Sequence, residues 1–478
     1  MLDHAESLRQ TVHSATDRAH KSAMGQFMTN ARVASFMAGL FQARRGAMHL
    51  LDPGAGLGAL TCAVLEHHPK KVKSASVEAW ELDARLAAHL TTTLSAYEAK
   101  GARVAVHNAD FLADVPLTPR FTHCCMNPPY KKIATDSAAR INTRRFGLET
   151  VNLYSAFVGA ALDLMLPGGQ LVAIIPRSFA NGPYYLPFRR FVLQRAAIHR
   201  IHLFDSRQKA FSDDDVLQEN VILLLERGGT QGDVVVSTST DDAFADVAEQ
   251  TFPFASIVQP GDDQVFIHMP TDAVDPLASK GIDHSLTDLD VSVSTGPVVD
   301  FRMRDYTRAE PQEGAVPLLY AHHYQGTRVE WPAIGAKKPN AIVDTPETRK
   351  WLVPAGLYLS VRRFSAKEEK RRVVASLVDT TTIGPYAFVG IENHQNYFHR
   401  AKRGLPKDLA WGLFVYLNST LLDDHLRRFS GHTQVNATDL RNIRYPSSAV
   451  LEEWGRWAQA QDTIEQTDID TIVGELRA

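Results

Sequence analysis

The chain has 478 residues, of which 44% are hydrophobic and 22% are charged, and its formal net charge is −3 at pH 7. These values are ordinary for a globular protein, and the length is enough for two or three domains. No apolar run approaches the length of a membrane span, and the N-terminus lacks the profile of a signal peptide. We therefore expect a soluble cytoplasmic protein without a membrane partner.

Three cysteines occur in the chain, at positions 62, 124 and 125. They form no C-x-x-C pair, so the sequence predicts neither a zinc site nor a disulfide framework. We expect no metal site. Cys124 and Cys125 fall in a predicted strand, where buried thiols are the ordinary interpretation.

The first informative segment is residues 50–60, which predicts an apolar strand, a glycine turn and the start of a helix. The spacing of Gly54, Gly56 and Gly58 differs from the dinucleotide pattern G-x-G-x-x-G, and no phosphate-binding loop is present. Glycines let a backbone approach a ligand closely. Taken alone, such a turn is more often structural than part of a cofactor site.

Two acidic positions follow at the ends of the next two predicted strands. Glu81 ends the strand 76–81, where a carboxylate can take both hydroxyls of a ribose. Glu78 is an alternative for this role, because strand registers read from a sequence are uncertain. Asp110 and Phe111 follow the strand that begins at Arg103 and can contact the amino group and the ring of an adenine.

The most informative stretch is Asn127-Pro128-Pro129-Tyr130, which follows the predicted strand 121–126. The prolines fix two φ angles and remove two N–H donors, and they push Asn127 out of the helical region. The resulting stiff turn can aim the Asn127 amide oxygen and the Pro128 carbonyl at one point. Two uncharged acceptors suit a planar –NH2 group, and Tyr130 offers a flat face for a ring. The alternative is a plain turn at a strand end.

Four predicted strand ends thus each carry a polar or otherwise special residue. Ligands of open α/β sheets bind outside the carboxyl ends of the strands. Each residue alone could be a helix cap or a surface charge, but four in series favour one ligand site.

These segments resemble the S-adenosylmethionine-dependent DNA adenine-N6 methyltransferases of the gamma class, in the restriction–modification group of PstI-type enzymes. The resemblance covers most of the chain. It implies a catalytic tetrad at Asn127, Pro128, Pro129 and Tyr130. It also implies S-adenosylmethionine contacts from a larger set, namely Thr29, Asp52, Gly54, Gly56, Glu81, Asp110 and Phe111.

The same resemblance implies the reaction and its partners. A methyl group passes from S-adenosylmethionine to an adenine that has been turned out of double-stranded DNA. Phe211 is the candidate for a second aromatic side chain in the flipped-base pocket. A separately encoded restriction endonuclease is an expected partner. Together these features describe a site-specific enzyme that protects host DNA.

The alternation of apolar strands and helical stretches predicts an α/β fold, with a Rossmann-like, mostly parallel sheet in a catalytic domain at 1–235. An acidic connector is expected at 236–290, a mixed α+β target-recognition domain at 291–450 and a C-terminal helix at 451–478. The stretch from Arg140 to Lys209 is rich in basic residues, which fits either a phosphate-binding face or solvated surfaces.

Three other functions remain open. Glutamine-amide methyltransferases that act on release factors also use Asn-Pro-Pro-Tyr after a glycine loop, but they are shorter and lack a large C-terminal domain. A specificity protein with a decayed catalytic half would not keep an intact tetrad. A fused restriction nuclease is possible, but the sequence shows no convincing P-D…[DE]-x-K pattern, and the segment near Glu392 matches a His-Asn-His nuclease poorly.

Overall fold

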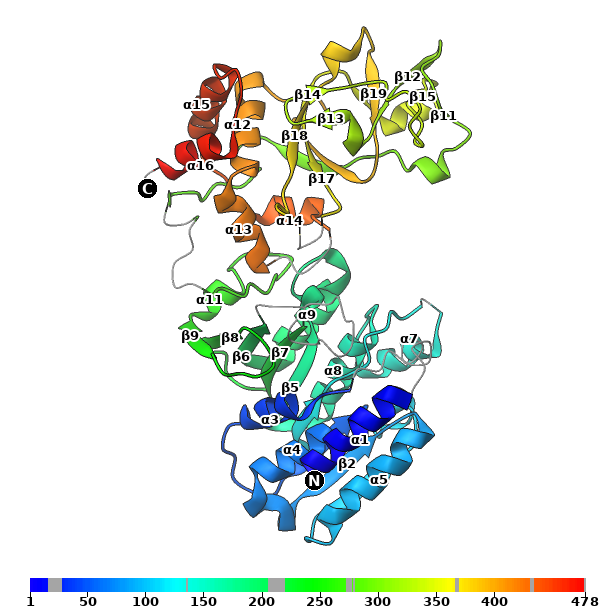
Figure 1. Cartoon of the computed structure of the whole chain (residues 1–478), viewed down its shortest axis with the longest axis vertical. Helices are drawn as coiled ribbons and strands as arrows, with labels where there is room; N and C mark the ends of the chain where they lie inside the picture. Colours follow the sequence, from blue (N-terminus) through cyan, green and yellow to red (C-terminus); the bar gives the residue numbers. More distant parts are fainter. Residues whose placement is uncertain are drawn as a thin grey trace. The chain divides into compact units, whose positions relative to one another are not determined.

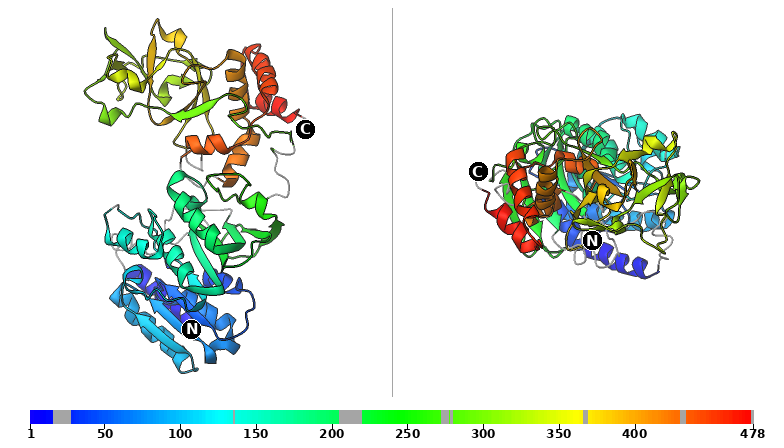
Figure 2. Two further views of the ribbon diagram at one scale, coloured as in Figure 1. Left: turned by 180° about the vertical axis from the view of Figure 1, so that it is seen from behind. Right: turned by 90° about the horizontal axis from the view of Figure 1, so that it is seen from above.

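A computed structural model describes residues 1–15, 28–134, 136–204, 220–271, 277, 280–365, 369–429 and 434–476. The chain divides into two compact units, Met1–Ala273 and Val274–Ala478 (Figures 1 and 2). None of the described helices combines the length and the apolar character that a membrane span requires.

The first unit is built on a nine-stranded sheet with the order β3-β2-β1-β4-β5-β7-β6-β8-β9. Its strands are β1 (His49–Pro53), β2 (Ser76–Trp80), β3 (Arg103–His107), β4 (Phe121–Met126), β5 (Met165–Pro176), β6 (Ala196–Phe204), β7 (Asn220–Arg227), β8 (Val234–Ser239) and β9 (Ala248–Phe252). The five strands from β3 to β5 in this order are parallel. β7 runs antiparallel to both β5 and β6. The predicted mostly parallel α/β fold is confirmed.

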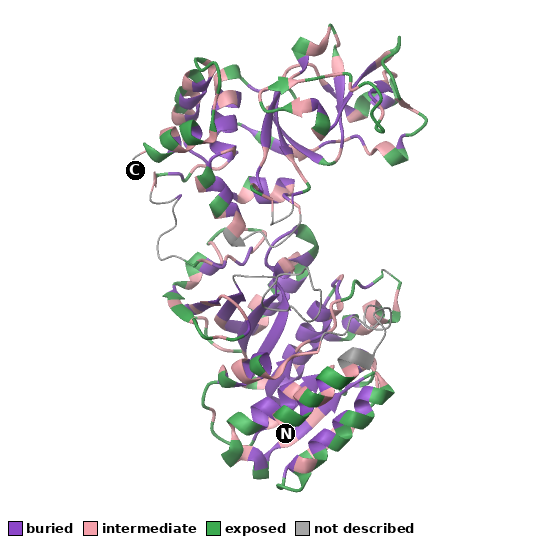
Figure 3. Cartoon of the chain, viewed as in Figure 1, coloured by how far each residue is buried: buried purple, intermediate pink, exposed green. Residues whose placement is uncertain are grey.

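Helices cover both faces of this sheet, and the central strands are therefore buried on both sides. On β4, Cys124 and Met126 pack with residues of α8 and α9, whereas Cys125 packs on the opposite face with residues of α3, α4 and α5. Figure 3 shows the central strands buried, while α5 carries an exposed outer face. The thiols of Cys62, Cys124 and Cys125 are all free and buried.

The helices of the first unit have the following bounds: α1 (Leu2–Ala15), α3 (Ala31–Gly39), α4 (Ala59–His67), α5 (Ala84–Glu98), α6 (Phe111–Asp114), α7 (Ala138–Thr143), α8 (Leu153–Leu164), α9 (Leu186–Arg195) and α11 (Phe254–Ile257). α1 packs on α3 and α4. The described N-terminus therefore lies beside the segment that follows β1.

The sheet extends past the predicted end of the catalytic domain at residue 235, which falls inside β8. β8 pairs with β6, and β9 pairs with β8, so part of the expected connector belongs to the sheet. Val234 and Val236 are buried while Val235 between them is less so, which is the alternation of a half-buried strand. The acidic composition of the stretch concealed this short pattern.

The second unit contains antiparallel strands and a group of helices, in agreement with the predicted mixed α+β domain. A four-stranded sheet has the order β10 (Ser292–Thr295), β20 (Gln395–His399), β17 (Leu357–Arg362) and β18 (Ala375–Asp379). A five-stranded sheet has the order β11 (Thr307–Arg308), β15 (Ala341–Val343), β12 (Ala315–Leu319), β19 (Phe388–Ile391) and β16 (Leu352–Pro354). β13 (Tyr324–Gln325) and β14 (Arg328–Val329) form a hairpin. The helices are α12 (Lys407–Leu417), α13 (Thr420–Phe429), α14 (Ala437–Asn442), α15 (Ser448–Gln459) and α16 (Gln466–Gly474).

Two glycines allow α12 and α15 to approach closely. A Cβ atom built on Gly412 of α12 would lie 1.8 Å from the carbonyl oxygen of Leu451, and one on Gly455 of α15 would lie 1.9 Å from that of Asp408. Because both obstacles are backbone atoms, they cannot rotate away as a side chain can. The helix pair therefore depends on the absence of side chains at these two positions.

We predict that Gly412→Ala destabilises the second unit by about 1–3 kcal/mol, the range typical of overpacking. Helix propensity alone would favour alanine by about 1 kcal/mol, so a loss identifies the steric cause. Gly474→Ala in α16 is the matched control, because nothing lies within 4 Å of its added Cβ. Urea unfolding followed by circular dichroism measures both variants, and equal midpoints would contradict the close packing.

A buried carboxyl group ties β1 to the following helix. Asp52 is 0% exposed, and its Oδ2 accepts a hydrogen bond of 2.7 Å from the Thr61 hydroxyl of α4. Its Oδ1 has no hydrogen-bond partner among the described residues. Burial raises the pKa of the Asp52 carboxyl from 3.8 to about 7, because the charged form loses its hydration.

This raised pKa predicts a pH dependence of stability. Between about pH 4 and pH 7 the folded chain holds a proton on Asp52 that the unfolded chain releases, so the group stabilises the fold at low pH and this contribution is lost as the pH rises through 7. Asp52→Asn keeps an acceptor for Thr61 but does not titrate. Urea midpoints at pH 5 and pH 8 should therefore differ less in this variant than in the wild type, and an unchanged difference would refute the assignment.

Candidate active site

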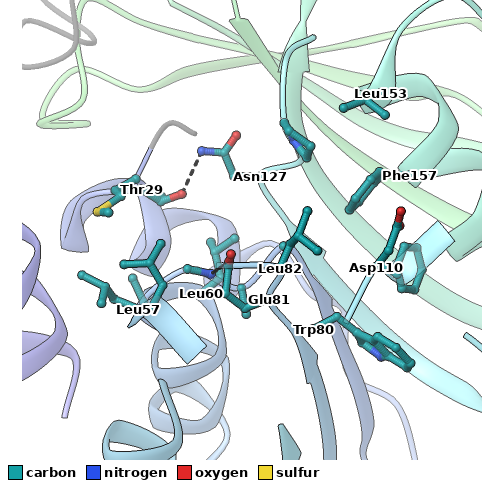
Figure 4. Close-up of a pocket in the computed structure, with 18 of the residues that line it drawn as sticks. Thr29, Leu57, Leu60, Trp80, Glu81, Leu82, Asp110, Asn127, Leu153 and Phe157 are labelled. Atoms are coloured by element: carbon teal, nitrogen blue, oxygen red, sulfur yellow. Dashed lines mark hydrogen bonds between the residues drawn. The ribbon is translucent and has the colours of Figure 1, made fainter. Parts of the chain in front are cut away.

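A cavity of about 260 Å³ opens at the carboxyl ends of β1, β2, β3 and β4. Its wall is mostly apolar, with a small number of polar side chains at separate points, as is usual for small-molecule sites. The lining residues are Ala5, Arg9, Met28, Thr29, Gly54, Ala55, Gly56, Leu57, Ala59, Leu60, Trp80, Glu81, Leu82, Leu86, Ala109, Asp110, Phe111, Leu112, Asn127, Pro129, Lys131, Ala139, Leu153 and Phe157. Figure 4 shows part of this wall.

The glycine turn after β1 is held against the end of β2. The N–H groups of Gly54 and Ala55 both donate to the carbonyl oxygen of Trp80 at 2.8 Å. Gly54 has a φ of +76°, which other residues rarely adopt, and Gly58 has a φ of +86° where α4 begins. The turn therefore places bare backbone on the wall of the cavity.

Glu81 faces the cavity from the end of β2. Its Oε2 accepts from the N–H of Gly56 at 2.9 Å, and its Oε1 accepts from the N–H of Asp83 at 2.8 Å. Burial raises the pKa of the Glu81 carboxyl. A carboxylate has about four acceptor positions, so these two bonds leave capacity for further donors. The side chain is thus fixed in place and still able to accept from a ligand.

The side chain of Glu78, the alternative to Glu81, is directed toward Arg120. Its two carboxylate oxygens accept from Arg120 at 2.8 Å and 2.7 Å, and it does not line the described cavity. Successive residues of a strand point to opposite faces of the sheet. Because Glu78 and Glu81 are three residues apart, which is an odd separation, their side chains have different surroundings.

Asp110 and Phe111 lie at the end of β3, where α6 begins. The Asp110 carboxylate caps α6 by accepting from the N–H of Leu112 at 2.9 Å. The Phe111 ring is 2% exposed and lies 5.3 Å from the Phe157 ring and 5.9 Å from the Trp80 ring, centroid to centroid. These aromatic rings form an apolar corner of the cavity beside one carboxylate.

Asn127 stands at the end of β4, where its amide group meets two hydroxyls. Its Nδ2 donates to the Thr29 Oγ1 at 3.1 Å, drawn as a dashed line in Figure 4. Its Oδ1 accepts from the Tyr130 hydroxyl at 2.8 Å. Pro129 lines the same cavity, and Pro128 is buried. The amide therefore faces the space that Glu81 and Asp110 also border.

Tyr130 packs with its ring against the core of the sheet. Its hydroxyl also lies 3.1 Å from the carbonyl oxygen of Ile174 on β5, and its ring meets that of Tyr154 edge-on at 6.3 Å. Burial raises the pKa of the Tyr130 hydroxyl, which keeps it protonated as a donor. Its role as a stacking surface for a base stays a prediction.

Most of the predicted site residues therefore meet at one cavity. Among the described residues, the lining includes Thr29, Gly54, Gly56, Glu81, Asp110, Phe111, Asn127 and Pro129. Asp52, Pro128 and Tyr130 do not line it but adjoin residues that do. Phe211 lies outside the described residues. No group of three or more possible metal ligands occurs in the part of the chain that the structure describes.

Sequence reasoning missed other parts of the wall. Ala5 and Arg9 come from α1, and Phe157 comes from α8. These residues have no recognisable spacing relative to the glycine turn. Trp80 and Leu82 directly flank Glu81, and this adjacency was a usable signal for them. Lys131 directly follows Tyr130, and this adjacency to the tetrad was a usable signal as well.

Comparisons with solved structures support the fold. A chain in the cryo-electron microscopy structure of the DrdV–DNA complex matches with a TM-score of 0.52 and 12% identity, covering 95% of this chain and 59% of that one. The type IIL restriction–modification enzyme MmeI, solved in complex with DNA, matches with a TM-score of 0.50 and 11% identity, covering 100% of this chain and 74% of that one.

Comparisons of sequence identify the family. Residues 66–211 match the family described as Eco57I restriction-modification methylase. The type II methyltransferase M.BsuBI of Bacillus subtilis is 43% identical over 100% of this chain and 98% of its own length. The type II methyltransferase M.PstI of Providencia stuartii is 40% identical over 98% of this chain and 96% of its own length. With such identity over nearly the full length of both relatives, the chain belongs to the type II DNA methyltransferases of restriction–modification systems.

Proposed function

We propose that this protein is a site-specific adenine-N6 methyltransferase that uses S-adenosylmethionine and acts on a base turned out of double-stranded DNA. The observation that carries the proposal is the meeting of Asn127 with Glu81 and Asp110 at one cavity. The cavity thus combines the neutral amide of Asn127, which can accept a hydrogen bond from an amine, with two carboxylates, which can accept from the hydroxyls and amino group of a nucleoside. A separately encoded restriction endonuclease is the expected partner of such an enzyme.

The residues of the cavity fit the proposed cofactor. Glu81 keeps acceptor capacity for the two ribose hydroxyls, and Asp110 can accept from the amino group of an adenine. Trp80, Phe111 and Phe157 supply an apolar corner for the ring. When bound, S-adenosylmethionine supplies a methyl group on a positively charged sulfur that leaves as a neutral thioether.

The tetrad would act on the nucleophile. The lone pair of an adenine amino nitrogen is delocalised into the ring, so the nitrogen attacks poorly while it remains planar. Hydrogen bonds from that amino group to the Asn127 Oδ1 and the Pro128 carbonyl favour a tetrahedral nitrogen and offset its growing positive charge. These acceptors are held before the reaction begins, and the remaining task is to align nitrogen, methyl and sulfur.

Reaching the adenine inside a duplex requires that the base leave the stack. In our proposal the Tyr130 ring replaces part of the lost stacking on one face of the base. Phe211, which lies outside the described residues, is the candidate for the other face. The edge-on contact with Tyr154 orients the partly buried ring of Tyr130.

The second unit is proposed as the target-recognition domain. Three of its segments, 320–324, 392–397 and 431–436, carry residue types that are able to read base edges. The described side chains there are largely committed to the fold: His323, Glu392 and Asn396 are at most 1% exposed. His322 and His394 are exposed, and 46% of the His394 side chain is accessible although it pairs with Glu392. Base-reading residues therefore have to be sought among the exposed positions of the unit.

The direct test offers radiolabelled S-adenosylmethionine with duplex DNA amplified in vitro, or with a release factor. We expect label only in the DNA and, after enzymatic digestion, in N6-methyl-2′-deoxyadenosine. Label only in the release factor would establish the alternative glutamine-amide activity. Label in a cytosine derivative would refute the proposed base.

We predict that Asn127→Ala lowers the rate of methyl transfer by at least about 100-fold, the cost typical of removing one preorganised polar group from an active site. The affinity for S-adenosylmethionine, measured by calorimetry, should stay near that of the wild type because the amide acts on the base. A large loss of cofactor affinity would show that Asn127 has been misplaced in the mechanism.

We predict that Glu81→Gln weakens S-adenosylmethionine binding roughly 10- to 100-fold, as expected for the loss of charge-assisted hydrogen bonds. Glu78→Gln is the matched control, three residues earlier, and its carboxylate faces Arg120 instead of the cavity. Calorimetric titration distinguishes the two. A weaker cofactor affinity in the control than in Glu81→Gln would reverse our assignment.

A further inference from the structure

An amide side chain has two ends of similar shape and opposite function. Only its oxygen can accept a hydrogen bond from an amino group, whereas its nitrogen can only donate. If Asn127 presented its nitrogen toward an adenine amino group, two donors would face each other. Some other group must therefore distinguish the two ends of this side chain.

The two hydroxyls beside Asn127 contact different ends of the amide. The Thr29 Oγ1 accepts from Nδ2 at 3.1 Å (Figure 4), and the Tyr130 hydroxyl donates to Oδ1 at 2.8 Å. The Tyr130 hydroxyl holds the acceptor end of the amide, and the Thr29 hydroxyl holds its donor end. Of the two, only Thr29 lines the cavity itself.

Thr29 occupies a well-anchored position immediately before α3. The next residue, Asn30, caps this helix by accepting from the N–H of Val33 at 2.9 Å, and its Nδ2 donates to Asp242 at 2.6 Å. The N–H of Ala31 donates to Glu6 of α1 at 3.0 Å. The start of α3 is thus held from α1 and from the turn between β8 and β9, so its neighbour Thr29 has little freedom to follow a moving amide.

We propose that Thr29 is a positioning residue for methyl transfer: its hydroxyl holds the Asn127 nitrogen and so keeps the amide oxygen turned toward the target amino group. This inference rests on the proposed function. It differs from the direct cofactor contact that the family resemblance implies for Thr29, because the group that Thr29 touches here is the amide acting on the substrate.

The test compares two substitutions that differ in one group. Thr29→Val keeps the shape and removes the hydroxyl, and Thr29→Ser restores the hydroxyl without the methyl. Single-turnover methylation of unmethylated duplex DNA should be roughly tenfold slower in Thr29→Val, as expected for the loss of one orienting hydrogen bond, and largely recovered in Thr29→Ser. The dissociation constant for S-adenosylmethionine, from calorimetry, should change less than about twofold.

Two outcomes overturn the inference. An unchanged rate in Thr29→Val shows that the hydroxyl does not position the amide, and a loss of cofactor affinity equal to the loss of rate shows that Thr29 serves the cofactor. Thr91→Val on the exposed face of α5, where the hydroxyl bonds only to the preceding helical turn, controls for the substitution itself.

A double variant separates this inference from the proposed function. If Thr29 acts through Asn127, adding Thr29→Val to Asn127→Ala causes no further loss of residual activity. A further loss of the same size as in the single variant overturns the inference alone. Full activity of Asn127→Ala overturns the proposed function and the inference with it.

Discussion

The candidate site depends on the hydrogen bonds that join the turn after β1 to the end of β2. Gly54 and Ala55 donate to the Trp80 carbonyl, and Gly56 donates to the Glu81 carboxylate. The Trp80 carbonyl at the end of β2 therefore fixes the shape of the glycine turn, and the N–H of Gly56 in that turn orients the Glu81 carboxylate. Because β1 lies between β2 and β4 in the sheet, the same turn also borders β4, which Asn127 directly follows. The parallel sheet brings these ends together, and the reciprocal bonds decide which atoms face the cavity.

The polar groups of the cavity are few and each is restrained. Glu81 is held by two backbone N–H groups and Asn127 by two hydroxyls. Restraint of this kind is what preorganised catalysis requires, since polar groups that are already oriented need no reorganisation when charge develops. The tetrad is consequently more than a rigid proline turn: its first and last residues contact each other, and a third side chain from the start of α3 completes the arrangement.

The charged residues show why composition is a poor guide to a binding surface here. The basic stretch from Arg140 to Lys209 resembles a phosphate-binding face in sequence, yet several of its arginines have partners within the first unit. Arg140 and Arg144 both contact Glu149, and Arg195 contacts Asp163. Arg189 is 0% exposed and donates to three backbone carbonyl oxygens. Arg189 is thus satisfied inside the fold, whereas Arg144 keeps 59% of its side chain exposed beside Glu149, so a basic run alone does not identify a surface for DNA.

The sequence by itself determined the order of strands and turns from β1 to β4 and the residues at their ends, because glycine, proline and apolar runs constrain the backbone locally. It did not determine which of Glu78 and Glu81 faces the cavity, since a difference in side-chain direction is settled only by the register of β2. Nor did it reveal that β8 and β9 join the sheet or that α1 and α8 contribute to the cavity. Those features depend on contacts between segments distant in the chain, such as the bond between Thr29 and Asn127, and only tertiary packing brings such segments together.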